Sequence, residues 1–393
     1  MSAEGNVQAA PRTVLVYRND LLPISETFIK EQATALSKSK WRAVLVGKRL
    51  LKDQLPLSEL KSKLLDPGQS RLGRITWKAF KANGHLPSQA VAALRAENPR
   101  LVHAHFGPDS LDAWPVANSL GVPLLITLHG YDVQISRDWW ESGRAGFRMR
   151  FYPRRLLALA RRPSVSFLAV SHAIRQRAVE IGIPADKIRL NYIGIDVEKF
   201  RPGSTPIVER PKNILFVGRL VEKKGCQYLL EAMSEVQKLH PTARLIVVGD
   251  GPLRKTLEAS ARQHGINAVF RGALGQREIL SELHAARVFC LPSVVAENGD
   301  AEGFGLVLLE AQACGVPVVT SALGGALEGI RDGCTGYRFL EKDIKMLADR
   351  LSKVLDEDEV TAKMALEARR FVVDNFDLRR CAQKLEEIYD RVQ

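Results

Sequence analysis

Short apolar runs alternate with helix-like segments along the whole chain. In the first half, runs rich in β-branched and other apolar residues lie at 13–17, 42–47, 101–106, 123–130, 166–171 and 187–192. After a break the series restarts at 213–220, 244–251, 268–274, 286–293 and 316–321. Segments between the runs, such as 226–239, have the periodicity of amphipathic helices. The alternation predicts strand–helix units on a parallel sheet, and its restart predicts a second sheet.

The break in the pattern predicts a domain boundary. Residues 201–212 are rich in proline and polar residues and show no periodicity, which is typical of a linker. A chain of 393 residues with 46% hydrophobic content is also long for one core. We therefore expect an α/β protein with two doubly wound, Rossmann-like domains, at 1–200 and 213–375, that face a cleft. Ligands of such sheets bind beyond the carboxyl ends of the strands.

The net charge of +13 lies in the first half of the chain. Residues 1–200 hold 30 Lys and Arg against 17 Asp and Glu, whereas residues 201–393 hold 27 of each. A basic half indicates an acidic partner, which is a nucleic acid, an anionic membrane surface or a phosphate-bearing substrate. Composition does not choose among these three.

Composition also bears on the compartment. No run of 18 apolar residues occurs, and the start MSAEGNVQAAPRT lacks the layout of a secretion signal, so we expect a cytoplasmic protein. The five cysteines are scattered, at 226, 290, 314, 334 and 381. They suit reduced thiols better than disulfides or zinc, and we expect no metal site.

The most informative stretch is ENGDAEGFGLVLLEAQACGVPVV, at 297–319. Gly303 and Gly305 suit a tight turn into a helix whose first amides and positive dipole end face a phosphate. If most of 302–310 is helical, Glu302 and Glu310 lie roughly 12 Å apart. A carboxylate accepts two hydrogen bonds from a vicinal diol, so the pair fits the two ends of a nucleotide sugar. Alternatively, they are an ordinary loop residue and an ordinary helix residue.

Two other segments of the second half place glycines and cations after predicted strands. In FVGRLVEKKG (216–225), Arg219 and Lys224 follow a strand that ends at Gly218, and they suit either a diphosphate or a solvated turn. In VVGDGPLRKTLE (247–258) the glycines do not form G-x-G-x-x-G, which argues against a nicotinamide enzyme.

Two smaller motifs have both a functional and a structural interpretation. TLHGYD (127–132) leaves His129 at a strand end beside Gly130, where it either reaches across the cleft or stays a structural histidine. A D-x-D pattern at Asp356 and Asp358 lies in a charged helical segment, and we interpret it as a solvated face rather than a metal site.

Taken together, these residues resemble the glycosyltransferases of family 4, which have the two-domain GT-B architecture. The resemblance covers essentially the whole chain and is carried by HFG (105–107), LHGYD (128–132), AVSHAIR (169–175), IGIDVEKF (193–200), FVGRLVEKKG (216–225), VVGDGPL (247–253), FRG (270–272), LPS (291–293) and EGFGLVLLEAQACGVPVV (302–319). LPISETFIKEQ (22–32) and HAHFG (103–107) further resemble the subgroup that builds bacterial exopolysaccharides, such as colanic-acid-type enzymes.

The resemblance implies a role for each matching residue. Arg219 and Lys224 would hold the donor diphosphate, Glu302 the hydroxyls of the transferred sugar and Glu310 the ribose, while His129 would lie beside the reacting sugar. The other donor-binding positions would be Gly218, Arg271 near the base, and Gly303, Phe304, Gly305 and Leu306. Ser171 and Asp196 follow strands of the first domain but match less directly.

The resemblance also implies the reaction. Family members retain the anomeric configuration and need no bound metal or cofactor, because cations and a helix dipole stabilise the departing nucleotide diphosphate. The donor would be a UDP- or GDP-sugar. The acceptor would be a saccharide, either free or linked to polyprenyl pyrophosphate, in exopolysaccharide or surface polysaccharide biosynthesis. In this architecture residues 376–393 would cross back to the first domain as a helix.

The chain departs from the family pattern at two places. Many members have a glycine-rich loop after the first strand, where this chain has NDLLPISET (19–27). VVAENGDAEG (294–303) resembles an insertion and adds Glu297 and Asp300 beside Glu302. Glu302 remains the predicted sugar ligand because it alone has the spacing to Glu310.

A basic, aromatic segment occupies 137–162 and holds eight arginines. Its aromatic residues are Trp139, Trp140, Phe147, Phe151 and Tyr152. The segment either lies on anionic lipid at the inner face of the cytoplasmic membrane or packs its aromatics into the first domain.

Two other functions compete with sugar transfer. A basic nucleic-acid-binding protein would need basic and aromatic residues interleaved on a recognised module; only 137–162 qualifies, so we expect no nucleic acid. A nucleotide-sugar epimerase with the same GT-B cleft is the closer rival, and it would change the donor sugar without an acceptor.

Overall fold

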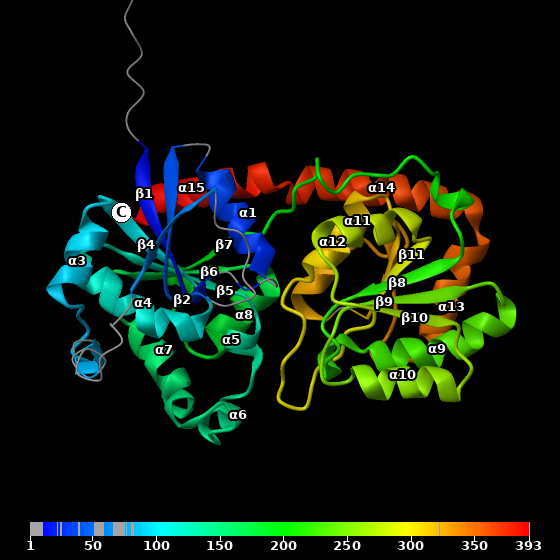
Figure 1. Cartoon of the computed structure of the whole chain (residues 1–393), viewed down its shortest axis with the longest axis horizontal. Coiled ribbons are helices and arrows are strands. Elements are labelled where there is room, and N and C mark those ends of the chain that lie inside the picture. Colours follow the sequence, from blue (N-terminus) through cyan, green and yellow to red (C-terminus); the bar gives the residue numbers. More distant parts are fainter. Residues whose placement is uncertain are drawn as a thin grey trace, which may run out of the picture.

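Two α/β domains lie side by side in the computed structural model (Figure 1). The structure describes residues 11–21, 23, 26–37, 40–50, 59–65, 75, 77–79, 82–321 and 323–392. Each domain is built on one parallel sheet with helices packed against it. The predicted fold class of two Rossmann-like domains is therefore confirmed.

The first domain has a seven-stranded sheet in the order β3-β2-β1-β4-β5-β6-β7. Its strands are β1 Arg12–Leu21, β2 Trp41–Leu50, β3 Lys61–Leu64, β4 Pro99–His105, β5 Leu124–Leu128, β6 Val165–Ala169 and β7 Ile188–Leu190. Its helices, with 3-10 helices marked η, are α1 Thr27–Leu36, α3 Ser88–Arg95, α4 Gly107–Leu120, α5 Tyr131–Gln134, α6 Arg137–Glu141, η2 Phe147–Phe151, α7 Tyr152–Ala160, α8 His172–Glu180 and η3 Ala185–Lys187. The central strands are continuous apolar runs because the sheet is covered on both faces; β5, for example, is buried throughout.

The second domain has a six-stranded sheet in the order β10-β9-β8-β11-β12-β13. Its strands are β8 Asn213–Val217, β9 Arg244–Val248, β10 Ala268–Gly272, β11 Val288–Leu291, β12 Val318–Thr320 and β13 Gly336–Arg338. Its helices are η5 Glu222–Lys224, α9 Cys226–Leu239, α10 Arg254–Gln263, α11 Gln276–Ala285, α12 Leu306–Ala313, η6 Gly324–Gly329, α13 Ile344–Asp356 and α14 Asp358–Phe376. In each sheet the strand order reverses beside the first strand of the domain, which is where open parallel sheets bind ligands.

Every predicted run contains a strand, but two edge strands were not predicted. β3 reads KSKL and leaves three of its four residues exposed, so it has no apolar run. β13 reads GYR and is only three residues long. Both lie at sheet edges, where pairing with a neighbouring strand rather than burial defines the strand.

The chain passes between the domains twice. The first passage contains η4 Ile207–Glu209, where Arg210 is buried and donates to backbone carbonyls of the second domain at 3.2 Å. The second leads from α14 into α15, Leu378–Val392. The two passages touch, because the Ile195 N–H donates to Phe376 O and the Leu378 N–H donates to Ile195 O, both at 2.9 Å.

The last helix, α15, packs on α1 and belongs to the core of the first domain (Figure 1). Leu385 and Tyr389 are fully buried there. The Tyr389 hydroxyl lies 2.7 Å from His103 Nδ1, and the Trp41 indole N–H donates to Asp390 at 3.0 Å. The first domain is therefore completed by residues that follow the whole second domain.

The cysteines and the D-x-D pattern, for which no chemical role is predicted, lie in the following positions. All five cysteines are free thiols, and four of them are buried. The D-x-D pattern joins two helices: Asp356 ends α13, and Asp358 begins α14 and forms an ion pair with the buried Arg287. Both aspartates are exposed to solvent, as the solvated-face interpretation expects. Across the part of the chain that the structure describes, no three His, Cys, Asp or Glu side chains converge as a metal site requires, and no helix is long and apolar enough to cross a membrane.

Candidate active site

Loops that follow β5 and β11 meet between the two domains. A Cβ placed on Gly303 would lie 2.0 Å from the carbonyl oxygen of His129. One placed on Gly130 would lie 3.1 Å from Gly303 Cα. Glycine at both positions lets the backbones of the two domains touch, because any side chain would separate them. The contact joins two segments that the sequence analysis singled out.

Lys224 and Glu302 form an ion pair beside this contact. Lys224 ends η5, and Gly225 turns the chain with φ of 68° at a point where a Cβ would strike the Pro292 carbonyl. Both side chains are largely buried, with 16% and 13% of their surface exposed. Burial acts to raise the pKa of Glu302, but the charges of Lys224 and Lys223 outweigh it and hold that pKa below its ordinary value. The carboxylate is therefore ionised at neutral pH.

The loop 294–303 offers other carboxylates, but they lie elsewhere. Asp300 pairs with Lys223 at 2.9 Å, and Glu297 is exposed. The Ser136 N–H donates to Asn298 O at 3.1 Å, which fastens the loop to the first domain. Glu302 is thus the carboxylate of this loop that meets Lys224.

The turn before α12 is built as the glycines predict, but the helix starts late. Gly305 lies in the left-handed region with φ of 75°, and α12 begins at Leu306. The estimate of roughly 12 Å between the two glutamates assumed a helix over most of 302–310, whereas 302–305 is not helical. The Phe304 ring stacks on Tyr192 with centroids 5.3 Å apart, so its side chain belongs to the contact between the domains.

Glu310 lies on α12 near a polar cluster that joins the domains. Burial and then the charge of Glu31 raise the pKa of Glu310 to about 7, against the attraction of Lys199. Glu31 on α1 accepts hydrogen bonds from Lys199 Nζ at 3.0 Å and from the Gln276 amide at 3.1 Å. Glu31, Lys199 and Gln276 also line a pocket of about 650 Å³. Sequence analysis missed this cluster because its members come from α1, the interdomain passage and α11.

The remaining predicted donor ligands are at the ends of β8 and β10. Arg219 is exposed and forms no ion pair with any residue that the structure describes. Gly218 is packed closely, since a Cβ on Gly249 would lie 1.9 Å from its carbonyl oxygen. Arg271 is half exposed and its guanidinium lies 3.1 Å from Glu282 on α11. Arg219 is thus free to meet a ligand, whereas Arg271 already has a partner.

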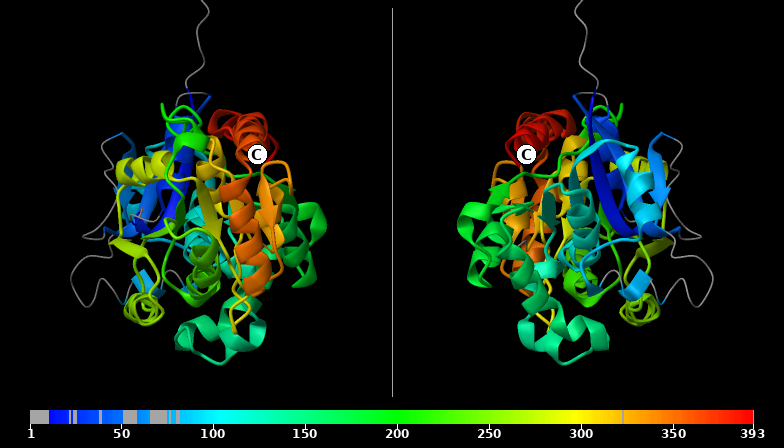
Figure 2. Two further views of the ribbon diagram at one scale, coloured as in Figure 1. Left: turned by 90° about the vertical axis from the view of Figure 1, so that its right-hand side faces the viewer. Right: turned by 90° about the vertical axis from the view of Figure 1, so that its left-hand side faces the viewer.

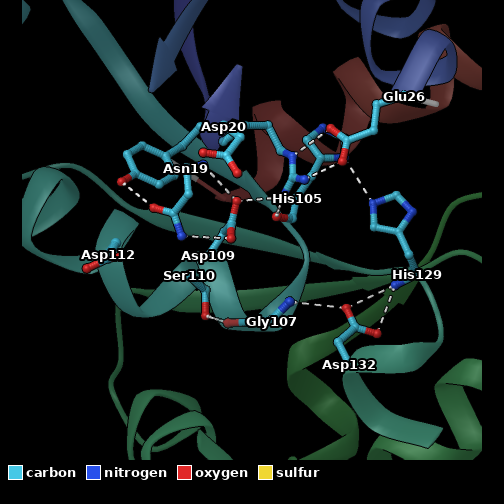
Figure 3. A network of polar contacts seen from close by, with 12 residues as sticks. Asn19, Asp20, Glu26, His105, Gly107, Asp109, Ser110, Asp112, His129 and Asp132 are labelled. Carbon is cyan, nitrogen blue, oxygen red and sulfur yellow. Dashed lines mark hydrogen bonds and ion pairs between the residues drawn. The ribbon is translucent and has the colours of Figure 1, made fainter. Parts of the chain in front are cut away.

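The backbone at His129 is held by one carboxylate (Figure 3). Asp132 accepts hydrogen bonds from the N–H groups of His129 at 3.1 Å and Gly130 at 2.8 Å. It also accepts from the N–H of Gly107 at 3.1 Å, which links the ends of β4 and β5. These bonds fix the turn that carries His129.

The His129 ring is held on three sides by other rings. His129 Nε2 lies 3.1 Å from His105 Nδ1, and the two imidazoles stack. The ring centroids of Phe28 and Phe106 lie 5.3 and 4.3 Å from that of His129. Burial lowers the pKa of His129 well below its ordinary value, and the charge of Arg18 lowers it further. His129 is therefore a neutral imidazole with a fixed orientation.

A buried ion-pair network lies next to this ring (Figure 3). Arg18, on β1, pairs with Glu26 and Asp109, and its guanidinium lies over the Phe106 ring at 4.4 Å. Burial raises the pKa of both carboxyls despite the attraction of Arg18. Asp109 also accepts from the Asn19 N–H at 2.8 Å. Sequence analysis missed the network because its residues are separated along the chain and meet only where β1 and β4 pair.

Two hydrogen-bonding residues complete the contact between the domains. Ser171 Oγ donates to Gly303 O at 3.2 Å. Glu328, on η6, accepts from two N–H groups at the start of α8, at 3.0 and 3.1 Å, and from the Tyr192 hydroxyl at 2.7 Å. Asp196, the other less direct match, accepts from the N–H groups of its own turn. Glu328 was not singled out in the sequence because an isolated glutamate carries no local signal.

The basic, aromatic segment divides its aromatics between core and surface. Trp140 and Tyr152 are buried, as the packing interpretation expects. Phe147 and Phe151, on η2, are 71% and 48% exposed among exposed arginines. The side views show that α6 and η2 project on the side opposite α15 (Figure 2).

Two family models match the chain, one over each domain. The model described as Glycosyltransferase Family 4 matches residues 25–199. The model described as Glycosyl transferases group 1 matches residues 197–371. Together they span both sides of the contact between the domains.

Individual relatives and solved structures agree with these family matches. Glycogen synthase of Mycobacterium tuberculosis (strain H37Rv) is 29% identical over 333 residues, 82% of this chain and 78% of its own. The putative colanic acid biosynthesis glycosyltransferase WcaL of Escherichia coli K12 is 31% identical over 281 residues, 70% of this chain and 66% of its own. The solved structure of Anabaena Alr3699/HepE in complex with UDP and glucose shares the fold, with a TM-score of 0.78 and 20% identity over 97% of this chain and 100% of that one.

Proposed function

The chain belongs to the GT-B glycosyltransferases of the family 4 type, and from this premise we propose that it transfers a hexose from a UDP- or GDP-sugar to a saccharide acceptor with retention of configuration. The observation that carries the proposal is the Lys224–Glu302 pair, which lies before α12 and beside the backbone contact with His129. This arrangement supports the proposal because a cation, a helix start and a carboxylate that would bind the sugar lie together between the domains.

In the proposed reaction the bond from the anomeric carbon to the diphosphate oxygen breaks, and the acceptor oxygen bonds to that carbon on the same face. The acceptor proton passes to the departing diphosphate. Negative charge grows on the diphosphate as it leaves, and the N-terminus of α12, Lys224 and the exposed Arg219 would stabilise it. Glu302 would orient the sugar hydroxyls, Glu310 would bind the ribose, and neither role calls for a metal or a cofactor.

The nature of the donor and pathway is supported by similar proteins. The Anabaena structure holds UDP and glucose, and WcaL is named for colanic acid biosynthesis. We therefore propose a nucleoside-diphosphate hexose as donor and a growing bacterial exopolysaccharide or surface polysaccharide as product, with an acceptor linked to polyprenyl pyrophosphate. Neither a nucleotide-sugar epimerase nor a nucleic-acid-binding protein finds support among the similar proteins.

Product analysis tests this proposal. The purified protein is incubated with UDP-glucose, UDP-galactose or GDP-mannose and with saccharide-lipid extracts as acceptor, and the product is examined by proton NMR. We expect a new glycosidic bond with the same anomeric configuration as in the donor. An inverted product would contradict retention, and a changed donor sugar without any acceptor would identify an epimerase.

The same proposal places the enzyme at the inner face of the cytoplasmic membrane, through Phe147, Phe151 and the arginines around them. Exposed aromatic side chains flanked by arginines suit the boundary of an anionic bilayer. Flotation with phosphatidylglycerol vesicles at low salt tests this, and we expect binding that salt weakens. Serine at both phenylalanines should abolish binding. Serine at Leu366, which is 74% exposed on α14, is the matched control and should leave binding intact.

A further inference from the structure

His105 is the polar partner of the His129 ring, although no role in the reaction has been assigned to it. Its Nδ1 lies 3.1 Å from His129 Nε2, and the two rings stack with centroids 5.3 Å apart and planes 27° apart. His105 ends β4 and His129 follows β5, so the contact is built into two paired strands.

Both imidazoles are neutral at physiological pH. Burial, and after it the charges of neighbouring groups that include Arg18, lower the pKa of His105 and of His129 well below the ordinary value. A hydrogen bond between two neutral imidazoles holds a single proton. If His105 donates from Nδ1, then His129 accepts at Nε2 and carries its own proton on Nδ1. If His129 donates from Nε2, then His105 carries its proton on Nε2.

The different burial of the two rings favours one of these two arrangements. His105 is 2% exposed, whereas His129 is partly exposed. A proton on His105 Nε2 would belong to this almost fully buried side chain, and no hydrogen bond joins that atom to a described residue. In the opposite arrangement the spare N–H belongs to the more exposed ring, where a ligand or water can accept from it. A buried N–H without a partner is the more unfavourable of the two.

We propose that His105 is a positioning residue that donates from Nδ1 to His129 Nε2 and thereby fixes His129 in the Nδ1–H tautomer. Phe28 and Phe106 prevent the ring from turning over, since both pack against it. His129 then offers the transferred sugar one group only, a hydrogen-bond donor at Nδ1. This last step rests on the proposed function, whereas the tautomer does not.

Nitrogen NMR tests the tautomer directly in the full chain without ligand. Selective ¹⁵N labelling of the eight histidines, with two-bond nitrogen–proton correlation, shows which nitrogen of each ring is protonated. The His129 signals are assigned by their loss in His129→Phe. We expect His129 to be protonated on Nδ1 and not on Nε2. A wild-type His129 protonated on Nε2 would overturn the proposal.

Two variants of nearly equal size separate positioning from packing. In His105→Asn the side-chain amide takes the place of Nδ1 as donor, and in His105→Leu no donor remains. We expect the Asn variant to keep the His129 tautomer and the Leu variant to shift it toward Nε2–H, the form that free imidazole favours. His103, whose nitrogens lie 2.7 Å from Tyr389 and 2.6 Å from Thr127, should keep its tautomer in both and reports that the core is folded.

Kinetics with the donor supply a second measurement. The Leu variant should lose about tenfold in kcat with little change in KM, and the Asn variant should regain most of that loss. An unchanged tautomer and rate in a folded Leu variant would overturn the inference. Failure of the wild type to use any nucleotide sugar would instead overturn the proposed function. The NMR result would still test whether His105 sets the tautomer of His129.

Discussion

The Lys224–Glu302 ion pair is mostly buried, so each partner depends on the other. Removing one partner leaves a buried charge, which is more destabilising than removing both. Lys223 already forms an ion pair with Asp300, so it cannot fully replace Lys224 as the partner of Glu302. The pair therefore links the stability of the second domain to the site that would bind the donor.

We expect Lys224→Met and Glu302→Gln each to lower the free energy of unfolding by roughly 2 to 4 kcal/mol, and the double variant to recover at least half of that loss. Activity should stay low in all three, because the double variant restores packing but not the ligands. Chemical denaturation and a transfer assay measure the two effects. Additive losses of stability in the double variant would show that the two side chains do not interact.

The surroundings of Glu310 raise its pKa, whereas those of Glu302 lower the pKa of that carboxyl. The Glu310 pKa of about 7 lies above the value of 4.5 expected in the unfolded chain, so the folded state binds the proton more tightly. The resulting stabilisation is present below about pH 4.5 and is lost as the pH rises toward 7. Glu310→Gln should remove this fall, which amounts to at most about 3 kcal/mol. Melting curves from pH 5 to pH 8 measure it, and parallel curves for variant and wild type would contradict the assigned burial.

Local sequence pattern singled out candidate residues that lie in short motifs and missed the contacts that depend on the fold. Lys224 and Glu302 are far apart in sequence, yet each follows a recognisable strand end, and the structure pairs them. Glu31, Gln276 and Lys199 have no such signal, because hydrogen bonds that join residues up to 245 positions apart create their cluster. His105 is an intermediate case, since it was noted in a motif but not as a partner of His129.

The start of α12 shows how a helix and its preceding turn shape the site. Gly303 lies against the His129 carbonyl, and Gly325, on η6, lies against Gly303, where a Cβ would come within 1.9 Å of its carbonyl oxygen. Three backbone segments therefore meet with no room for a side chain. The packing of these segments fixes the distance between the turn at 302–305 and the first domain.

Gly303→Ala should push the two domains apart by the size of one methyl group. We expect kcat/KM to fall about a hundredfold or more, because a shift of that size misplaces the reacting groups, while each domain stays folded by circular dichroism. Gly275→Ala is the control, since Gly275 has φ of −75° and a Cβ there would meet only the flexible Glu278 side chain at 3.3 Å. Equal activity of the two variants would show that the contact at Gly303 is not needed for transfer.

Strand and helix prediction worked where burial produces an apolar pattern. The strands at the centre of both sheets follow it closely, as in β1, whose residues 13–18 are all buried. The edge strand β3 was not predicted because three of its four residues are exposed, and β13 was not predicted because it is only three residues long. The place of α15 follows from packing over the whole molecule: Tyr389 and Leu385 enter the core of the first domain after the 164 residues from Asn213 to Phe376.

The whole molecule has two kinds of connection between its domains. The covalent passages touch at Ile195 and Leu378. Noncovalent contacts also join the domains, and among them are Ser171 with Gly303 and Glu328 with the start of α8. This layout suits opening and closing about the two passages.

Glu328→Ala should favour the open form. Small-angle scattering without donor should give a larger radius of gyration than the wild type, because two α8 caps and the Tyr192 bond are lost together. Asp343→Ala is the matched control: Asp343 caps α13 within one domain at 2.9 Å, so its loss lowers stability by about 1 kcal/mol without moving the domains. Equal radii of gyration for all three proteins would show that Glu328 does not hold the domains together.

Calorimetric titration with UDP-glucose and GDP-mannose decides whether the second domain binds a nucleotide sugar through Glu310. The wild type and Glu297→Gln, which alters an exposed carboxylate of the neighbouring loop, should bind one of these donors equally well. Glu310→Gln should bind that donor about ten- to a hundredfold more weakly, because an amide has one acceptor oxygen where the carboxylate offers two to the ribose hydroxyls. Equal binding by all three proteins, or no binding of either donor by the wild type, would contradict the proposed site.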